Sequence, residues 1–325
     1  MTELAIEATG LTKSFGETRA LAGVDLAVRR GTVHAVLGPN GAGKTTAIRI
    51  LAPLLRADSG TARVNGFDVR SAPEKVRESI GLTGQFASVD EDLTGTQNLV
   101  LIGQLLDLST REARRRAAEL LEWFDLTEAA NRMAKNYSGG MRRRLDLAAS
   151  LVGRPSVIFL DEPTTGLDPA KREDMWDVVR SLVSDGSTVL LTTQYLEEAD
   201  ALADEITVID HGKVIAHDTP HGLKRVVGGQ RLTIRPADPA RYDDLRQVLA
   251  EADALGGRVP EGDGRGTLTI QVDGDDVLPD VVSRLRAAGI VAEEFSLHLP
   301  SLDEVFFTLT GTRASNAHDT EEVAA

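Results

Sequence analysis

The chain's architecture follows from one loop, Gly38-Pro39-Asn40-Gly41-Ala42-Gly43-Lys44-Thr45-Thr46. It fits the phosphate-binding pattern of a glycine, a four-residue spacer and then Gly-Lys-Thr. The mostly apolar run Val33–Leu37 before the loop predicts a buried strand. The run Ala47–Leu51 after it contains no helix breaker and predicts a helix. A glycine-rich turn without a ligand is the alternative, but the strand and the helix on either side favour a phosphate site.

This loop has the chemistry of an anion site. Glycines allow backbone N–H groups to close around phosphate oxygens, and the N-terminus of the following helix adds partial positive charge. Lys44 is then placed to reach the β- and γ-phosphates of a nucleotide, and the Thr45 hydroxyl is placed to bind Mg²⁺.

A second group of candidates follows the continuous apolar run Val157–Leu160, which predicts another buried strand. Asp161 ends this strand, where a carboxylate is costly unless it serves a ligand. We expect Asp161 to hold Mg²⁺ through water and Glu162 to polarise the attacking water. An Asp-Glu pair after a strand would by itself be an ordinary helix cap, and the phosphate loop is what favours the catalytic interpretation.

The composition excludes several classes of protein. The 325 residues include 36 Lys and Arg against 50 Asp and Glu, a net charge of −14, which argues against broad nucleic-acid binding. The chain has no cysteine, so disulfides, thiol nucleophiles and Cys-ligated metals are excluded. No apolar run approaches the roughly 18 residues of a membrane span, and the first residues do not resemble a signal peptide. Pro220 lies between His217 and His221 and disfavours a helical metal-binding pair.

The order of patterns predicts two domains and a tail. Strands alternate with helices over residues 1–228, which indicates an α/β domain with a mostly parallel core sheet and helices on its faces. An antiparallel edge is expected from strands at Leu4–Ala8 and Ala20–Val28, separated by a turn at Gly10–Gly16. Residues of about 94–153 are mainly helical and predict a helical subdomain, in which Thr110 is the expected N-cap of one helix. Residues 229–310 contain two small β-α-β patterns, which predict an α+β accessory domain, of the ferredoxin-like kind, with a glycine-rich loop at residues 256–266. Residues 311–325 predict a disordered tail.

Two arginine runs, Arg114–Arg116 and Arg142–Arg144, lie on predicted helices. A nucleic-acid patch is one interpretation of such runs. A solvated helix face with ion pairs is the more common one, and it fits the acidic net charge better.

Further motifs resemble the ATP-binding-cassette (ABC) ATPases over about residues 3–225. Tyr137-Ser138-Gly139-Gly140-Met141 is similar to the family's signature Leu-Ser-Gly-Gly-Gln in its Ser-Gly-Gly core. Gln85 resembles the Q-loop glutamine, and Thr165-Gly166-Leu167-Asp168 resembles the D-loop. Phe15 stands where the family has an aromatic residue that stacks on adenine. Together with the phosphate loop and the Asp161 strand, these motifs follow the order that the family requires.

The resemblance implies a mechanism in which two copies pack head to tail with ATP between them. Ser138 and Gly140 of one copy then face the γ-phosphate held by Lys44 of the other, Gln85 senses Mg²⁺ and the attacking water, and Asp168 bridges the copies. The implied catalytic residues are Lys44, Gln85, Glu162 and Gln194. The implied Mg²⁺ site consists of Thr45, Gln85 and Asp161. The implied nucleotide-binding residues are Phe15, Gly38, Pro39, Asn40, Gly41, Ala42, Gly43, Lys44, Thr45, Thr46, Ser138, Gly139, Gly140 and Asp168.

Three positions depart from the family pattern. Gln194 occupies the switch position, which usually holds histidine; its amide can still hydrogen-bond the γ-phosphate but carries no proton or charge. This predicts an active but slow site. Met141 replaces the signature glutamine, and Phe15 replaces the commoner tyrosine; both changes are expected to be tolerated.

Two segments narrow the resemblance to the daunorubicin/doxorubicin-resistance ATP-binding proteins of antibiotic-producing bacteria: Gly84–Gly95 and Leu191–Asp200. Ser301–Phe306 resembles the tail of that subfamily. The tail is expected either to help dimerise the chain or hold the membrane subunit, or to be an ordinary amphipathic helix that closes the small domain.

The resemblance implies the ATP-hydrolysing subunit of an ABC exporter for an antibiotic or other amphipathic drug. Its expected partners are a second copy, as a homodimer, and an integral membrane permease, with the chain cytoplasmic on the inner face of the membrane. The first alternative is a soluble ABC ATPase that acts as a switch on ribosome or DNA. Such proteins usually carry two cassettes or a long coiled-coil insert, and this chain has neither. The second alternative is a non-hydrolysing regulator, suggested by Gln194 but opposed by the intact Lys44, Asp161 and Glu162. The cargo, and the choice between a homodimer and a mixed pair, stay open.

Overall fold

A computed structural model describes residues 3–84, 89–226, 229–252, 255, 258–262, 264, 266–272 and 277–311. The chain divides into two compact units, one that runs to Thr219 and one that begins at Pro220. Gln85 and the predicted tail beyond Gly311 lie outside the described residues.

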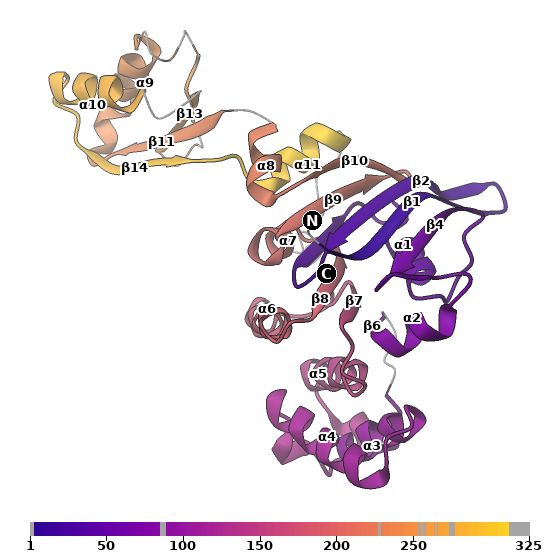
Figure 1. Cartoon of the computed structure of the whole chain (residues 1–325). Coiled ribbons are helices and arrows are strands. Elements are labelled where there is room, and N and C mark those ends of the chain that lie inside the picture. Colours follow the sequence, from indigo (N-terminus) through magenta and orange to yellow (C-terminus); the bar gives the residue numbers. More distant parts are fainter. Residues whose placement is uncertain are drawn as a thin grey trace, which may run out of the picture. The chain divides into compact units, whose positions relative to one another are not determined.

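The first unit is built on a six-stranded sheet (Figure 1). Its strand order is β10-β9-β3-β8-β7-β6, and every neighbouring pair except β10-β9 is parallel, which confirms the predicted mostly parallel core. All residues of β3, β7 and β8 are buried, as expected for parallel strands covered on both faces. The strands are β3 (Val33–Leu37), β6 (Ile80–Thr83), β7 (Val157–Asp161), β8 (Thr188–Thr193), β9 (Glu205–Asp210) and β10 (Lys213–Asp218).

A four-stranded antiparallel sheet, β2-β1-β4-β5, forms the predicted antiparallel edge. Its strands are β1 (Leu4–Phe15), β2 (Thr18–Arg29), β4 (Ser59–Val64) and β5 (Phe67–Asp68). The turn expected at Gly10–Gly16 was wrong, because β1 continues to Phe15. The register shifts between Ala8 and Leu11, and Gly10 adopts a φ of 61°, so a bulge lets the strand bend without ending. Helix α1 (Lys44–Leu51) contacts β2 and β4 on one side and β7 on the other, so it packs between the two sheets.

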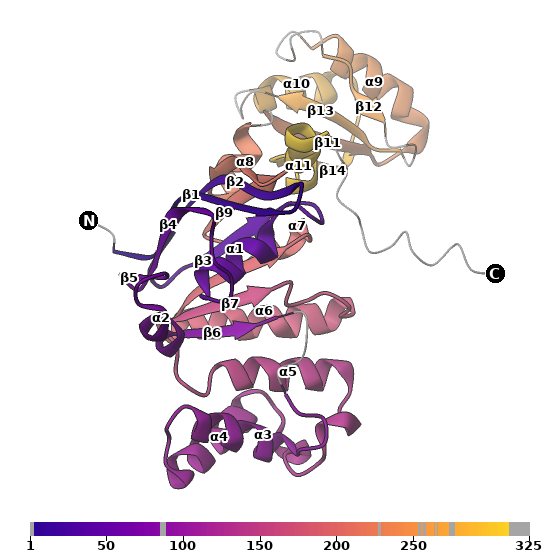
Figure 2. The same cartoon turned by 90° about the vertical axis from the view of Figure 1, so that its right-hand side faces the viewer.

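Three helices gather at one end of the first unit and form the expected helical subdomain (Figure 2). They are α3 (Gly95–Leu105), α4 (Thr110–Trp123) and α5 (Gly139–Ser150). Helix α4 begins with a capping box in which Ser109 accepts from the N–H of Glu112 and the Glu112 side chain accepts from the N–H of Ser109. Thr110 is therefore the first helical residue and not the N-cap. The unit also contains α2 (Pro73–Ser79), α6 (Pro169–Ser184) and α7 (Leu196–Leu202), and α2 was not predicted.

The second unit contains an antiparallel sheet of order β12-β13-β11-β14. Two β-α-β segments with this order form a ferredoxin-like sandwich, as predicted. Two helices, α9 and α10, contribute Leu245, Leu249, Val281 and Leu285 to a core shared with the strands. Strand β12 lies in the segment predicted as a glycine-rich loop. The elements are α8 (Pro220–Val226), β11 (Gln230–Pro236), α9 (Tyr242–Ala250), β12 (Glu261–Gly262), β13 (Leu268–Val272), α10 (Leu278–Ala287), β14 (Ala292–His298) and α11 (Leu302–Thr310).

Candidate nucleotide-binding site

The glycine-rich loop joins the carboxyl end of β3 to the N-terminus of α1, as the sequence predicted. Gly41 and Gly43 adopt φ angles of 81° and 109°, which favour glycine. A Cβ at Gly38 would collide with the Ile209 carbonyl, and one at Gly43 would collide with the Ala20 carbonyl, so the backbone approach also requires glycine. No side chain caps α1 and its first turn carries no acidic residue, so its leading N–H groups are suited to an anion.

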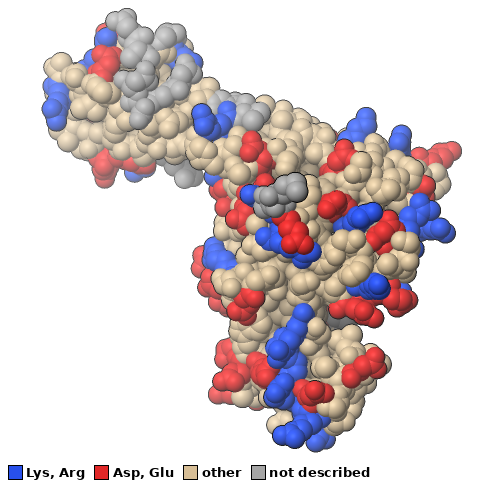
Figure 3. Space-filling model, viewed as in Figure 1, with Lys and Arg blue, Asp and Glu red and all other residues tan. Residues whose placement is uncertain are grey.

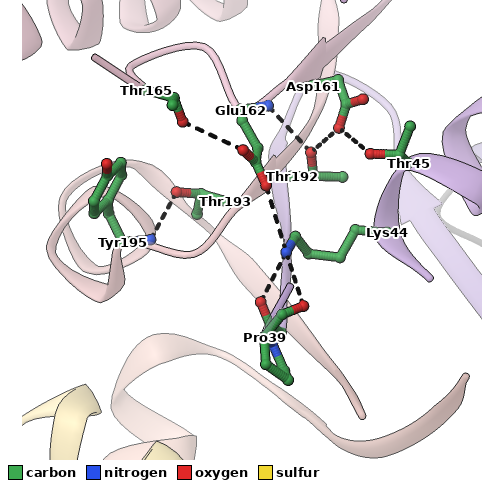
Figure 4. Close-up of polar contacts among 10 residues, drawn as sticks. Pro39, Lys44, Thr45, Asp161, Glu162, Thr165, Thr192, Thr193 and Tyr195 are labelled. Carbon is green, nitrogen blue, oxygen red and sulfur yellow. Dashed lines mark hydrogen bonds and ion pairs between the residues drawn. The ribbon is translucent and has the colours of Figure 1, made fainter. Parts of the chain in front are cut away.

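Lys44 lies at the centre of the site (Figure 4). Its side chain is 4% exposed, and its Nζ donates to the carbonyls of Gly38 (2.8 Å) and Pro39 (3.2 Å). The same Nζ lies 3.6 Å from Oε1 of Glu162. Burial lowers the pKa of the Lys44 amine, and the negative charges of Glu162 and Asp161 partly oppose that shift. The loop lysine and the proposed base therefore meet, although 118 residues separate them in the sequence.

Asp161 and Thr45 form the second contact of the site. Thr45 Oγ1 donates to Asp161 Oδ1 at 3.1 Å, and Thr192 Oγ1 donates to the same oxygen at 2.6 Å. Asp161 is 4% exposed and lies at the end of β7. A hydroxyl and a carboxylate brought together beside a phosphate loop are hard oxygen ligands of the kind that Mg²⁺ takes along with water and phosphate oxygens, so these residues fit that ion.

Glu162 is held in an uncommon backbone conformation. Its φ is 52°, in the left-handed region, and its N–H donates to the carbonyl of Thr192 at 3.0 Å. Thr165 Oγ1 donates to Oε2 of the carboxylate at 3.3 Å, while Oε1 faces Lys44. The carboxylate is thus oriented by both its backbone and its side-chain contacts.

The remaining predicted residues lie apart from this cluster. Ser138 is the N-cap of α5, where its hydroxyl accepts from the N–H of Met141 (3.2 Å), and it is exposed together with Gly139. Asp168 caps α6 in the same way and pairs with Lys171. Within the part of the chain that the structure describes, no hydrogen bond or ion pair joins Ser138 or Asp168 to Lys44.

Among the described residues, two further predicted ligands, Phe15 and Gln194, have no polar contact with this cluster. Phe15 ends β1, its side chain is 51% exposed, and the Lys13 Nζ lies 5.6 Å from its ring centroid. One face of an aromatic ring is therefore accessible, as adenine stacking requires. Gln194 lies half-buried in the turn between β8 and α7.

Sequence reasoning missed two threonines and one glutamate. Thr192 is the register partner of Asp161 in the parallel ladder of β7 and β8, and Thr165 reaches the Glu162 carboxylate. Glu198 on α7 is fully buried, and burial raises its pKa from 4.5 to about 7, although donors on Thr193 and nearby side chains pull it down. Polar residues at strand ends, and a glutamate at an otherwise apolar helix position, are the signals that could have identified them.

The charge distribution fits the sequence interpretation. Lys and Arg mix with Asp and Glu over the face in view, and a short basic band over the helical part has acidic side chains on both sides (Figure 3). Arg115, Arg116 and Arg154 all pair with Glu119, as expected for an ion-paired helix face. In the described part of the chain, no helix is long and apolar enough to cross a membrane, and no cluster of His, Asp or Glu has the makeup of a metal centre.

The chain is similar to known ATP-binding proteins over most of its length. A family model described as ABC transporter matches residues 21–165, and one described as ATP-binding protein DrrA1-3-like, C-terminal domain, matches residues 219–310. Daunorubicin resistance ATP-binding protein DrrA2 of Streptomyces coeruleorubidus is 53% identical over 317 residues, which cover 98% of each chain. Nod factor export ATP-binding protein I of Ralstonia nicotianae is 38% identical, covering 93% of this chain and 92% of that protein. A solved dimeric ATP-binding cassette in a post-hydrolysis state, bound to ADP and Pi, superposes with a TM-score of 0.60 at 26% identity, covering 66% of this chain and 98% of that one.

Proposed function

The chain belongs to the ABC transporter family of ATP-binding proteins and is an ATPase, and from this premise we propose that it powers the export of an antibiotic or other amphipathic drug. The drug would pass through a separate integral membrane permease, to which the chain binds on the cytoplasmic face. The observation that carries the proposal is the meeting of Lys44, Thr45, Asp161 and Glu162 at the ends of β3 and β7. The names of the relatives, which refer to drug resistance and to export, support the choice of cargo and direction.

The residues divide the work of phosphoryl transfer to water. The loop N–H groups and Lys44 bind and orient the β- and γ-phosphates. Thr45 and Asp161 would hold Mg²⁺, which would supply positive charge next to the phosphates. The Glu162 carboxylate accepts a proton from the attacking water, and its contacts with Lys44 and Thr165 fix the orientation of that carboxylate. Gln194 offers an amide N–H to the γ-phosphate.

The exposed positions of Ser138, Gly139 and Asp168 support a closed state made of two copies. In that state the N-terminus of α5 from one copy faces the nucleotide of the other. The N–H groups at this helix start again suit an anion. ATP binding then closes the pair, and release of products reopens it.

The test is ATP turnover by the purified chain, alone and with its membrane partner in vesicles, beside Glu162→Gln. We expect turnover that rises when partner and drug are added and that disappears in the variant. Brisk turnover that ignores the partner would favour the switch on ribosome or DNA. ATP binding without turnover under either condition would favour the non-hydrolysing regulator.

A further inference from the structure

Arg143 connects the helical subdomain to the catalytic strand ends. It lies on α5, and its guanidinium donates to the carbonyls of Pro163 (Nε, 3.0 Å), Gly84 (Nη1, 2.9 Å) and Glu162 (Nη2, 3.1 Å). Nη2 also lies 3.5 Å from the Asp161 carbonyl. The side chain is only 18% exposed, so these contacts are largely shielded from water.

The neighbouring arginines of the run do something different. Arg142 pairs with Glu91 at 2.8 Å, and Arg144 donates to the carbonyl of Phe124. Because successive helix residues point about 100° apart, three adjacent arginines face three surroundings. Arg143 also lies 3.8 Å from Asp146 Oδ2, but unlike Arg142 it directs its guanidinium hydrogen bonds at backbone carbonyls of the catalytic strand ends.

The ends of β6 and β7 leave backbone carbonyls that need donors from outside the sheet. Strands β6 and β7 are parallel neighbours, and both end where Arg143 reaches them. Carbonyls beyond the last ladder pair need other donors, and buried carbonyls left without one are costly. A guanidinium presents five N–H donors in a planar fork and can serve several carbonyls at once, whereas a lysine ammonium is a compact point charge.

One of these carbonyls belongs to Glu162, whose backbone has a φ of 52°. A non-glycine residue in this region is strained and needs its surroundings to hold it there. The Glu162 N–H is held by the Thr192 carbonyl on β8, and its carbonyl is held by Arg143 on α5. Arg143 thus holds the Glu162 carbonyl from the helical subdomain, opposite the contact that Thr192 makes from the sheet.

We propose that Arg143 is a positioning residue for ATP hydrolysis: it ties α5 to the ends of β6 and β7 and so keeps the Glu162 carboxylate directed at the reacting water. This inference rests on the proposed function, because it takes Glu162 to be the base. It predicts that the loss of Arg143 slows hydrolysis while the phosphate loop still binds ATP, since Lys44 and Thr45 do not contact the guanidinium.

The experiment compares Arg143→Gln and Arg143→Lys with the wild type and with Arg116→Gln. Arg116 is a matched control, because its Nη2 donates to the Leu151 carbonyl at 2.8 Å, where it joins α4 to the other end of α5. Its side chain is 16% exposed, close to the 18% of Arg143. Removing it should cost similar stability without touching the catalytic strand ends.

For Arg143→Gln we expect kcat to fall about tenfold to a hundredfold, as for other small misplacements of a catalytic group, with ATP affinity within about twofold. Arg143→Lys should give an intermediate kcat, and Arg116→Gln should keep kcat within about twofold of the wild type. Amide hydrogen exchange over residues 157–165 should rise in Arg143→Gln and stay unchanged in Arg116→Gln.

Two results would overturn the inference: wild-type kcat in Arg143→Gln, or equal losses of kcat in Arg143→Gln and Arg116→Gln. If Arg143→Gln fails to bind ATP, the kcat of Arg143→Lys decides in the same way. If the wild type binds ATP but never hydrolyses it, the proposed function fails instead. Hydrogen exchange then still decides the inference, because unchanged protection in Arg143→Gln contradicts the tie to the strand ends.

Discussion

Replacing Glu198 by glutamine should remove a pH dependence from the stability of the first unit. Glu198 is fully buried, and its pKa is raised from 4.5 to about 7, chiefly by burial. Donors on Thr193, Thr164 and Trp176 and the positive charge of Arg172 on α6 oppose this shift without cancelling it. Between these pH values the folded chain keeps a proton that the unfolded chain has released. Stability therefore falls as pH rises from 4.5 to 7, because the folded state binds more protons.

The magnitude follows from the shift. A pKa unit is worth about 1.4 kcal/mol, so the full titration amounts to roughly 3 kcal/mol of unfolding free energy. The unfolding free energy of Glu198→Gln minus that of the wild type should therefore increase by about 2.5 kcal/mol between about pH 5 and about pH 8. Glutamine has no charge to bury, so the variant gains relative to the wild type as pH rises.

Urea unfolding followed by tryptophan fluorescence is the appropriate assay. Both tryptophans, Trp123 and Trp176, lie in the first unit, so the signal does not report on the second. Glu197→Gln is the matched control, because that side chain is on the same helix but 79% exposed. A difference between Glu198→Gln and the wild type that stays flat within about 0.5 kcal/mol from pH 5 to pH 8 would refute the reasoning.

Three further predictions concern the site itself. Glu162→Gln should lower turnover about a hundredfold or more with ATP still bound, measured by phosphate release, and unchanged turnover would remove Glu162 from the role of base. Gly43→Ala should abolish ATP binding in a fluorescent-nucleotide titration, because its Cβ would meet the Ala20 carbonyl, whereas Gly41→Ala meets no atom and should bind more weakly without losing the site. Gln194→Ala should reduce kcat about tenfold, whereas Gln194→His should keep kcat at or above the wild-type value, because the glutamine is expected to make the site slow. An alanine variant as fast as the wild type would show that the Gln194 amide does not act on the γ-phosphate.

The sequence was sufficient where local pattern decides structure. The loop after Val33–Leu37 and the Asp161 strand end were predicted because a strand, a turn and a helix start each leave a local signature. Strand β1 was cut short in the prediction because Gly10 and Gly16 look like turn residues, whereas Gly10 forms a bulge in a continuous strand. A glycine with a positive φ is compatible with a turn and with a bulge, and only the pairing of β1 with β2 distinguishes the two.

The missed residues of the site depend on contacts between distant segments. Thr192 reaches Asp161 through the register of β7 and β8, which sequence alone does not fix. Arg143 could not be distinguished from Arg142, because the direction of each side chain depends on how α5 is rotated against the sheet. Periodicity identifies a helix and its apolar face, but it does not say which carbonyls lie opposite a given arginine.

The two sets of predicted site residues are joined by one helix. Ser138 starts α5, and Arg143 lies five residues further along the same helix, where it holds the Glu162 carbonyl. A helix is a rigid element, so in the closed pair proposed above a displacement of the α5 N-terminus by the second copy would also move the Glu162 peptide. This coupling can be tested in mixed dimers of one variant copy and one wild-type copy. Under that proposal, Ser138→Arg in one copy should lower the kcat of that same copy, and the loss should be smaller when Arg143→Gln is already present, because the connection along α5 is then broken. A double-mutant cycle on phosphate release from mixed dimers measures this, and additive losses of kcat would contradict it.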